Sequence, residues 1–280
     1  MKNNVILTFY LLFALGSYSQ SNILNASSPA EIGIQNFDQK QTDNDSFLEF
    51  DYIDERDILW SKIVYEKIDL NEKINFPLLF PINDETYEKN RKSLWRVLKE
   101  NILNKNITEI YFDRNDNFKD KMNFEDVLEV VSFTEMINGV QTPAEELKSI
   151  DISAYRIKGM WYFDKRQGEM KYRLLGLMPV GKNLKDDDGK NNTDLFWIWY
   201  PSIRKILHKE QVFNDKNNAN RISFDQLLVS RRFSSFIYKE DNVYGDRAIK
   251  DYKNPGLESI LESERIKKEI LDFEQDMWNR

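Results

Sequence analysis

The feature that most restricts the fold is a pair of strand-like segments joined by a short polar turn. Residues 153–163 and 169–180 are rich in Tyr, Ile, Trp and Phe, and the turn at 164–168 ends in glycine. Aromatic and β-branched residues favour strands, and a short connection makes two neighbouring strands antiparallel. Residues 195–200, with the sequence LFWIWY before Pro201, predict a third strand. The chain is therefore expected to contain an antiparallel sheet.

Helical spacing and capping residues predict helices as well. Residues 93–104 carry apolar side chains at helical spacing, and Ser93 is a residue type that caps helix N-termini. Residues 123–132 and 143–150 predict two short helices joined by a turn at Gly139. None of these helices carries a chemical motif.

The longest predicted helix covers residues 257–278. Ile266, Ile270, Phe273 and Met277 recur at intervals of three and four residues, whereas Glu and Lys occupy the other faces. Such a helix buries its apolar stripe against the rest of a domain. The remaining predicted elements are strands at 107–112 and 233–239, a helix that begins with a capping box of Ser223 and Gln226, and an extended segment between Pro77 and Pro81.

These elements together predict an α+β fold. It consists of an antiparallel β-sheet, built from the hairpin plus further strands and packed with several helices, an extended N-terminal arm and a long C-terminal helix. Apolar and aromatic residues become dense from Tyr52 onward, and no internal repeat or second boundary interrupts the rest. Residues 51–280 are therefore expected to form a single α+β domain.

Residues 1–19 have the pattern of a secretory signal peptide. Lys2 gives a basic start, residues 5–15 are nearly all apolar, and Ser17 and Ser19 stand where a cleavage site requires small residues. An apolar run of this length is too short for a transmembrane helix, which needs roughly 20 residues. The chain is therefore expected to be exported and cleaved after Ser19.

Residues 20–50 are expected to form an extended, partly disordered arm. Asn, Ser, Gln and Asp dominate its composition, and such a segment cannot bury enough surface to fold alone. Apolar residues are nevertheless scattered through it, namely Ile23, Leu24, Ile32, Ile34, Phe37, Phe47, Leu48 and Phe50. Two interpretations stay open: a plain disordered leader, or an arm that docks on another subunit.

Composition restricts the chemistry that the chain can perform. Lys and Arg total 40 against 47 Asp and Glu, so the net charge of −7 provides no positive field for nucleic acid. The absence of cysteine excludes thiol nucleophiles, disulfides and thiolate metal sites. One histidine, His208, excludes a site with two imidazoles, and no GxSxG motif accompanies it. We expect no nucleic-acid partner, no cofactor and no bound metal.

Two short motifs resemble ligand-binding loops but lack essential residues. GLMPVGKN at 176–183 fits GxxxxGK, yet Asn183 stands where a phosphate-binding loop needs Ser or Thr. If 186–189 is aligned as a calcium loop, its first and last ligand positions fall on Leu184 and Leu195, whose side chains carry no oxygen. Neither segment is predicted to bind a ligand.

Three tryptophans leave two interpretations open. Trp197 and Trp199 are two residues apart in a predicted strand, so they project to the same face, where packing on the sheet or on a partner is expected. Together with Trp161 and plentiful carboxylates, they also fit a periplasmic glycan-binding or glycan-cleaving protein. A peptidoglycan pull-down with an assay of muropeptide release separates these alternatives.

Several long segments resemble the gliding-motility GldN family, also called PorN, a component of the type IX secretion system. They are YRIKGMWYFDKRQGEMKYRLLGL at 155–177, ISFDQLLVSRRF at 222–233, IYKEDNVYGDRAIKDY at 237–252, FEQDMWN at 273–279, DILWSK and IDLNEKINFPLLFPI within 57–82, and SNILNASSPAEIG at 21–33. The resemblance covers most of the chain, and residues 114–150 fall outside it.

The resemblance implies a periplasmic structural protein. It would assemble with the outer-membrane lipoprotein GldK into a large ring, which associates it with the outer membrane, and contact the GldL/GldM motor. The family carries no recognised catalytic residue or cofactor, so the chain is expected not to be an enzyme. Self-association in a closed ring requires two different patches on each copy.

Partner contacts are expected on three segments of the surface. They comprise Arg56, Asp57 and Trp60 near the start of the domain, Asp164, Lys165 and Arg166 in the hairpin turn, and Tyr244, Asp246 and Arg247 in a later loop.

Deletion of residues 20–49 tests the second interpretation of the arm, under which it should abolish ring assembly. If the arm docks on a neighbouring copy, its removal takes away one of the two patches that a ring needs. The measurement is electron microscopy of rings copurified with the GldK-type lipoprotein, and unchanged ring assembly would contradict docking of the arm.

Overall fold

A computed structural model describes residues 47–83, 92–114, 116–133, 136–137, 140–141, 145–184, 192–212, 222–243 and 245–278. The predicted signal peptide and most of the predicted arm lie outside these residues, as do the turn at Gly139 and the segment 186–189. The chain divides into Met1–Ser46 and Phe47–Arg280, and all described helices and strands belong to the second unit.

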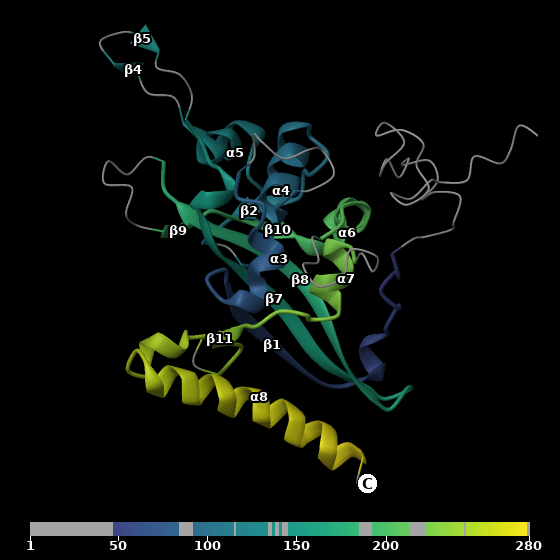
Figure 1. The fold of residues 1–280 in the computed structure, drawn as a ribbon. Coiled ribbons are helices and arrows are strands. Elements are labelled where there is room, and N and C mark those ends of the chain that lie inside the picture. The colour runs from purple at the N-terminus through teal and green to yellow at the C-terminus, as the bar shows by residue number, and fades with distance from the viewer. Residues whose placement is uncertain are drawn as a thin grey trace, which may run out of the picture. The chain divides into compact units, whose positions relative to one another are not determined.

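One antiparallel sheet of seven strands organises the described part of the chain (Figure 1). Its strand order is β11-β1-β7-β8-β10-β2, and β9 pairs with β8 beside this path. The strands are β1 (Ile58–Asp69), β2 (Ile110–Phe112), β7 (Ile152–Asp164), β8 (Glu169–Lys182), β9 (Asn192–Asp194), β10 (Phe196–Trp199) and β11 (Phe236–Glu240). The predicted hairpin therefore forms two central strands of the sheet.

Side chains on these strands alternate between the two faces, as the pleat of a β-strand requires. In β10, Phe196 and Ile198 belong to the main core, whereas Trp197 lies in a separate cluster. The ring of Phe118 makes edge contacts with both Trp197 and Trp199, at centroid distances of 6.1 and 4.9 Å. This confirms that the two tryptophans project to one face and pack within the fold.

Six α-helices accompany the sheet within the described residues: α3 (Phe76–Leu79), α4 (Leu94–Leu103), α5 (Phe124–Val131), α6 (Tyr200–Lys209), α7 (Phe224–Val229) and α8 (Leu257–Trp278). Short 3-10 turns occupy Glu55–Asp57, Lys73–Asn75, Ser149–Asp151 and Ile249–Asp251. The side chains of Ser93 and Ser223 accept hydrogen bonds from the backbone of Arg96 and Gln226, which confirms both as N-caps. The predicted C-terminal helix is confirmed over residues 257–278.

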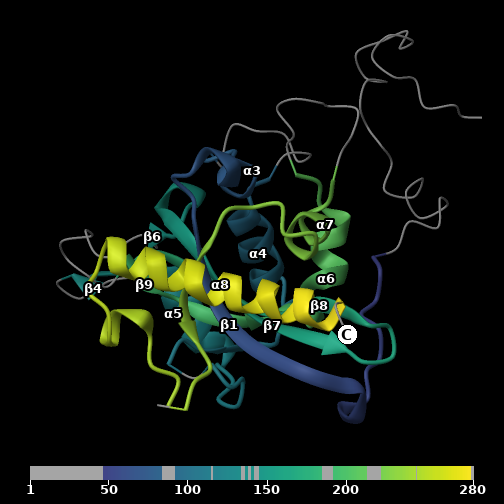
Figure 2. The ribbon, with the colours of Figure 1, turned by 90° about the horizontal axis from the view of Figure 1, so that it is seen from below.

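Two groups of helices cover different parts of the sheet. The main core joins α4, α6 and α7 to the central strands, and its largest side chains include Trp95 and Phe196. A second cluster places Ile266 and Ile270 of α8 on Val64 and Ile237 of β1 and β11. Figure 2 shows α8 crossing the long strands. The stripe of α8 at intervals of three and four residues is thus buried, as its spacing predicts.

The last residues of the predicted arm contact the domain itself. The rings of Phe47 and Phe50 lie 4.8 and 4.1 Å from the guanidinium of Arg204 on α6. The Arg204 side chain is 3% exposed, and its guanidinium forms an ion pair with Asp225 of α7 at 3.0 Å. A buried cation with both aromatic and carboxylate partners fixes the start of the domain against α6.

Two expectations were wrong. The segment between Pro77 and Pro81 is not extended, because α3 begins there with Pro77 in its first turn. Proline is tolerated at that position since its missing N–H would have no intrahelical partner. The described part of the predicted helix 143–150, which starts at residue 145, does not form an α-helix: Glu145–Glu146 is strand β6, which pairs with β3 (Ser132–Phe133).

Tertiary contacts explain the second error. The Leu147 N–H donates to the carbonyl of Val131, and the Trp95 indole donates to the Leu147 carbonyl at 3.1 Å. These bonds satisfy the backbone N–H and carbonyl of Leu147 in an extended conformation. Without them, the proline and the acidic residues at the start of this segment would favour a helix. Between β3 and β6 in the sequence, strands β4 (Met136–Ile137) and β5 (Val140–Gln141) form a separate pair.

Ile102→Ala is expected to lower the free energy of unfolding by about 3 kcal/mol, because Ile102 is fully buried and truncation leaves a cavity. Leu103→Ala, at the next position of α4, is the matched control: Leu103 is 38% exposed, and its loss should be below about 1 kcal/mol. Urea unfolding of both variants measures the difference, and equal losses would contradict the assigned burial.

Candidate partner interface

Strand β1 extends beyond its neighbour β11 and leaves an open edge. β11 pairs with β1 only from Val64 to Lys67, whereas β7 pairs with β1 along the whole strand. The backbone of Ile63 still has partners on that side, since its N–H donates to the Asp241 carboxylate and its carbonyl accepts from the Asp241 N–H. Residues 58–62 form the part of β1 that precedes the bonds between Ile63 and Asp241. We call these residues the open edge.

Backbone groups of Ser61 point outward from this edge. The N–H and the carbonyl of Ile63 both face away from β7. In an antiparallel strand every second residue orients its backbone groups in this way, so those of Ser61 also face away from β7. No described segment pairs with β1 at this position on the side opposite β7. Leu59, 51% exposed, is also part of the edge. An unpaired donor and acceptor beside an exposed leucine can receive an extended segment.

The hairpin turn lies beside the open edge. The Lys165 N–H donates to the Asp57 carbonyl at 2.8 Å, and Arg166 forms an ion pair with the Asp57 carboxylate at 3.7 Å. Asp164 is buried, and its carboxylate accepts from the backbone N–H of Arg166 at 2.9 Å. Asp164 therefore shapes the turn, whereas Lys165 and Arg166, like Arg56, are exposed and available to a partner.

Trp60 joins the open edge to α8. Its ring stacks on Phe273 with the ring centroids 4.8 Å apart and the planes inclined by 18°. An open groove of about 380 Å³ runs between β1 and α8 at this point. Its lining combines the two aromatic rings with charged residues of the helix, namely Arg265, Lys268, Glu269, Asp272 and Asp276. Trp60 thus supports internal packing with one face and borders a surface groove.

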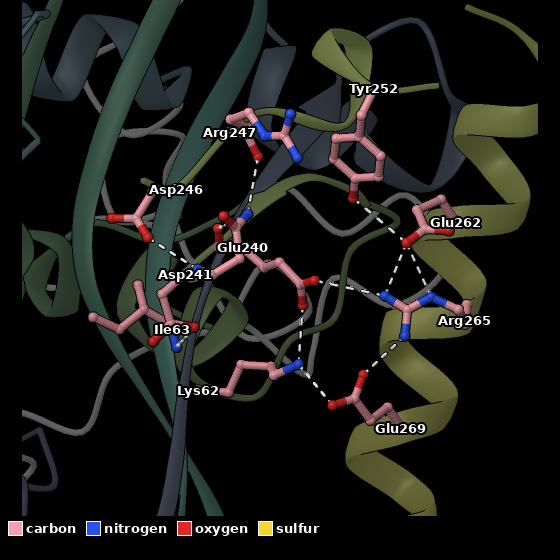
Figure 3. A network of polar contacts seen from close by, with 11 residues as sticks. Lys62, Ile63, Glu240, Asp241, Asp246, Arg247, Tyr252, Glu262, Arg265 and Glu269 are labelled. Carbon is pink, nitrogen blue, oxygen red and sulfur yellow. Dashed lines mark hydrogen bonds and ion pairs between the residues drawn. The ribbon is translucent and has the colours of Figure 1, made fainter. Parts of the chain in front are cut away.

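A polar network holds α8 to the two strands (Figure 3). The Lys62 ammonium lies 3.0 Å from a carboxylate oxygen of Glu240 in β11 and 2.9 Å from one of Glu269 in α8. Arg265 bonds Glu269 at 3.0 Å and Glu262 at 2.8 Å. The network therefore links three elements through alternating charges.

These partners change the pKa values of the network. Burial of Lys62 opposes its charge, but the hydrogen bonds that its ammonium donates to Glu269 and Glu240 outweigh burial and raise its pKa. Burial alone would raise the pKa of Glu269, and the bonds from Lys62 and Arg265 lower it instead. The hydrogen bond from Arg265 likewise lowers the pKa of Glu262. These directions keep Lys62, Glu262 and Glu269 charged at neutral pH.

The third predicted segment follows β11. The Asp246 carboxylate accepts from the backbone N–H of Asn242 at 2.9 Å, and the Arg247 carbonyl accepts from the Asn242 amide. Asp246 therefore holds its own loop together, next to the point where Asp241 closes the β1 edge (Figure 3). Tyr244 lies outside the described residues.

Sequence patterns did not predict the open edge or the network. Lys62 and Glu240 are 178 positions apart, and no local signal pairs them. Only the spacing of Glu262, Arg265 and Glu269 on α8 could have indicated ion pairs within a helix.

The GxxxxGK-like sequence does not have the structural context of a phosphate-binding loop. Residues 176–182 of the GxxxxGK-like sequence lie in strand β8, not in a loop before a helix. Among the described residues, no group of three or more Asp, Glu or His side chains is arranged to hold a metal ion, and no helix is long and apolar enough to span a bilayer.

Comparison with known proteins assigns the family. The model of the family described as "Gliding motility associated protein GldN" matches residues 53–279. The chain belongs to the GldN family. Membership makes it a component of the gliding-motility and type IX secretion machinery, as the resemblance indicated. No curated protein matches the chain.

Glu269→Gln is expected to weaken the dependence of stability on pH. The folded-state pKa of Glu269 lies below its ordinary value, so its contribution is complete above about pH 5 and is lost as the pH falls through the folded value. Urea unfolding between pH 7 and pH 3 should show a smaller decline for the variant than for the wild type.

The matched control is Asp272→Asn on the same helix. No ion pair of Asp272 occurs among the described residues, so this variant should retain the wild-type decline. At pH 7, Glu269→Gln should cost less than about 1 kcal/mol, because the Glu269 side chain is 46% exposed. Identical pH profiles for the two variants would contradict the role of the network.

Proposed function

We propose that the chain is a structural subunit of the type IX secretion and gliding machinery in the periplasm. In this proposal it assembles with a GldK-type outer-membrane lipoprotein into a ring under the outer membrane and contacts the GldL/GldM-type motor. It acts through repeated contacts between subunits and catalyses no reaction. Membership of the GldN family over residues 53–279 carries the proposal.

The surface around the open edge supports a role in assembly. It combines strand backbone at residues 58–62 that no described strand pairs on the side opposite β7, an exposed leucine at position 59 and the groove beside Trp60. Arg56, Lys165 and Arg166 add exposed positive charge next to this edge. In this proposal an extended segment of a partner adds a strand to β1, and its flanking residues contact the hairpin turn.

Backbone pairing and side-chain contacts would have different functions at such a site. Main-chain hydrogen bonds to an edge strand give affinity for almost any extended segment, and pockets for alternate side chains give specificity. The groove beside Trp60 is lined by carboxylates and by the cations Arg265 and Lys268, so it suits a polar side chain of the partner. The charged turn would orient the partner before the strands pair.

Ser61→Pro is expected to lower recovery of the GldK-type lipoprotein by about tenfold or more in pull-downs from envelopes. Proline at position 61 removes the outward N–H but no bond to β7, so the sheet should keep its fold. Ser61→Ala is the matched control, because it keeps the N–H and should recover the lipoprotein normally. Circular dichroism verifies that both variants are folded.

The same two variants test function in cells. A null strain that produces Ser61→Pro should secrete and glide poorly, whereas one that produces Ser61→Ala should behave as wild type. If the Ser61→Pro protein is folded and recovers the lipoprotein normally, the open edge is not part of the interface. Release of muropeptides from peptidoglycan by the purified chain would overturn the non-catalytic role itself.

A further inference from the structure

The outer side of α8 carries a second apolar stripe. Leu257, Ile260, Leu261 and Leu271 are 71%, 57%, 59% and 54% exposed. Ile266 and Ile270, which pack on the sheet, are at most 4% exposed. At about 100° per residue, the exposed leucines lie on the opposite side of the helix from these isoleucines. In Figure 1, no other described element lies on that outer side.

The exposed stripe has the spacing of a helix-pairing seam. Six positions alternate at intervals of four and three residues: Leu257, Leu261, Glu264, Lys268, Leu271 and Gln275. All six are exposed, and they fall within an arc of about 80°. This is the 3.5-residue repeat with which two helices pack side by side. We call these six positions the seam.

The two charges of the seam determine the relative direction of two paired copies. In a parallel pair, each Glu264 would face the Glu264 of the other copy, and the two Lys268 side chains would also face each other. In an antiparallel pair, Glu264 faces the partner's Lys268, and Leu261 faces the partner's Leu271. Leu257 then faces the partner's Gln275. Only the antiparallel arrangement pairs opposite charges and aligns leucine with leucine.

We propose that two copies of this chain associate through the seams of their α8 helices in antiparallel orientation. The contact is self-complementary, so a two-fold axis relates the copies. Glu264 forms an ion pair with Lys267 of its own helix at 2.9 Å, and its side chain is 62% exposed. An exposed pair of this kind holds the carboxylate weakly, so Glu264 can also bond a second ammonium group.

The polar network described above supports such a contact without taking part in it. Lys62, Glu240, Arg265 and Glu269 hold α8 on the sheet from its inner and lateral sides, so the seam is presented by a helix with a fixed rotation. The inference does not depend on the lipoprotein, the motor or a ring. The isolated chain is therefore sufficient to test it.

The test is a charge exchange followed by sedimentation equilibrium of the purified full chain. The wild type should show a monomer–dimer equilibrium. Glu264→Lys and Lys268→Glu should each weaken the dimer by about tenfold or more, because each places two like-charged contacts in the dimer. The double variant Glu264→Lys/Lys268→Glu should restore the wild-type constant. Asp276→Lys, the same charge change off the seam, is the matched control and should dimerise normally.

Introduced cysteines report the direction of the helices. The natural chain has no cysteine, so Leu261→Cys/Leu271→Cys contains only the two added thiols. After mild oxidation, peptide mapping should find disulfides between position 261 of one copy and position 271 of the other. Links from 261 to 261 and from 271 to 271 would show a parallel pair and overturn the proposal. A wild-type chain that remains monomeric, or a folded double charge variant that fails to dimerise, would also overturn it.

Discussion

Strand β7 is hydrogen-bonded along its length to β8 on one side and to β1 on the other, and the remaining elements depend on this pairing. The main core and the cluster under α8 both contain side chains of these three strands. The strands also differ in length, since β1 spans twelve residues and β11 only five. The open edge is the direct result of this difference, because β11 ends before β1 does.

Elements with local signals were predictable from the sequence. The β7–β8 hairpin has aromatic and β-branched strands with a short turn, α4 has Ser93 at its N-cap, and α8 has its apolar spacing. Strand β1 was not recognised as a strand, because the charged residues Lys62 and Glu66 interrupt its apolar pattern. Arg231, which neutralises Glu66 at 2.7 Å, is 165 positions away in the sequence. A buried charge becomes compatible with a core strand only through such a distant partner.

The candidate interface was predictable in part for the same reason. Exposed charges near Asp57 and in the hairpin turn were expected to form partner contacts, and the structure places them side by side. Asp164 was grouped with them, but its burial and backbone bonds give it a structural role in the turn. The open edge could not be predicted, because it depends on where β11 stops and how Asp241 closes the end. Neither property is encoded near residues 58–62.

Both long sides of α8 carry apolar residues, and this restricts how the helix can change during evolution. A single residue inserted near its middle would rotate the following part of the helix by about 100°. The apolar residues in that part would then no longer face the surfaces against which they pack. A heptad insertion would nearly preserve both orientations, at the cost of a longer helix. Homologous chains that keep both surfaces should therefore vary in length at the ends of this helix or by whole heptads, and not by single residues within it.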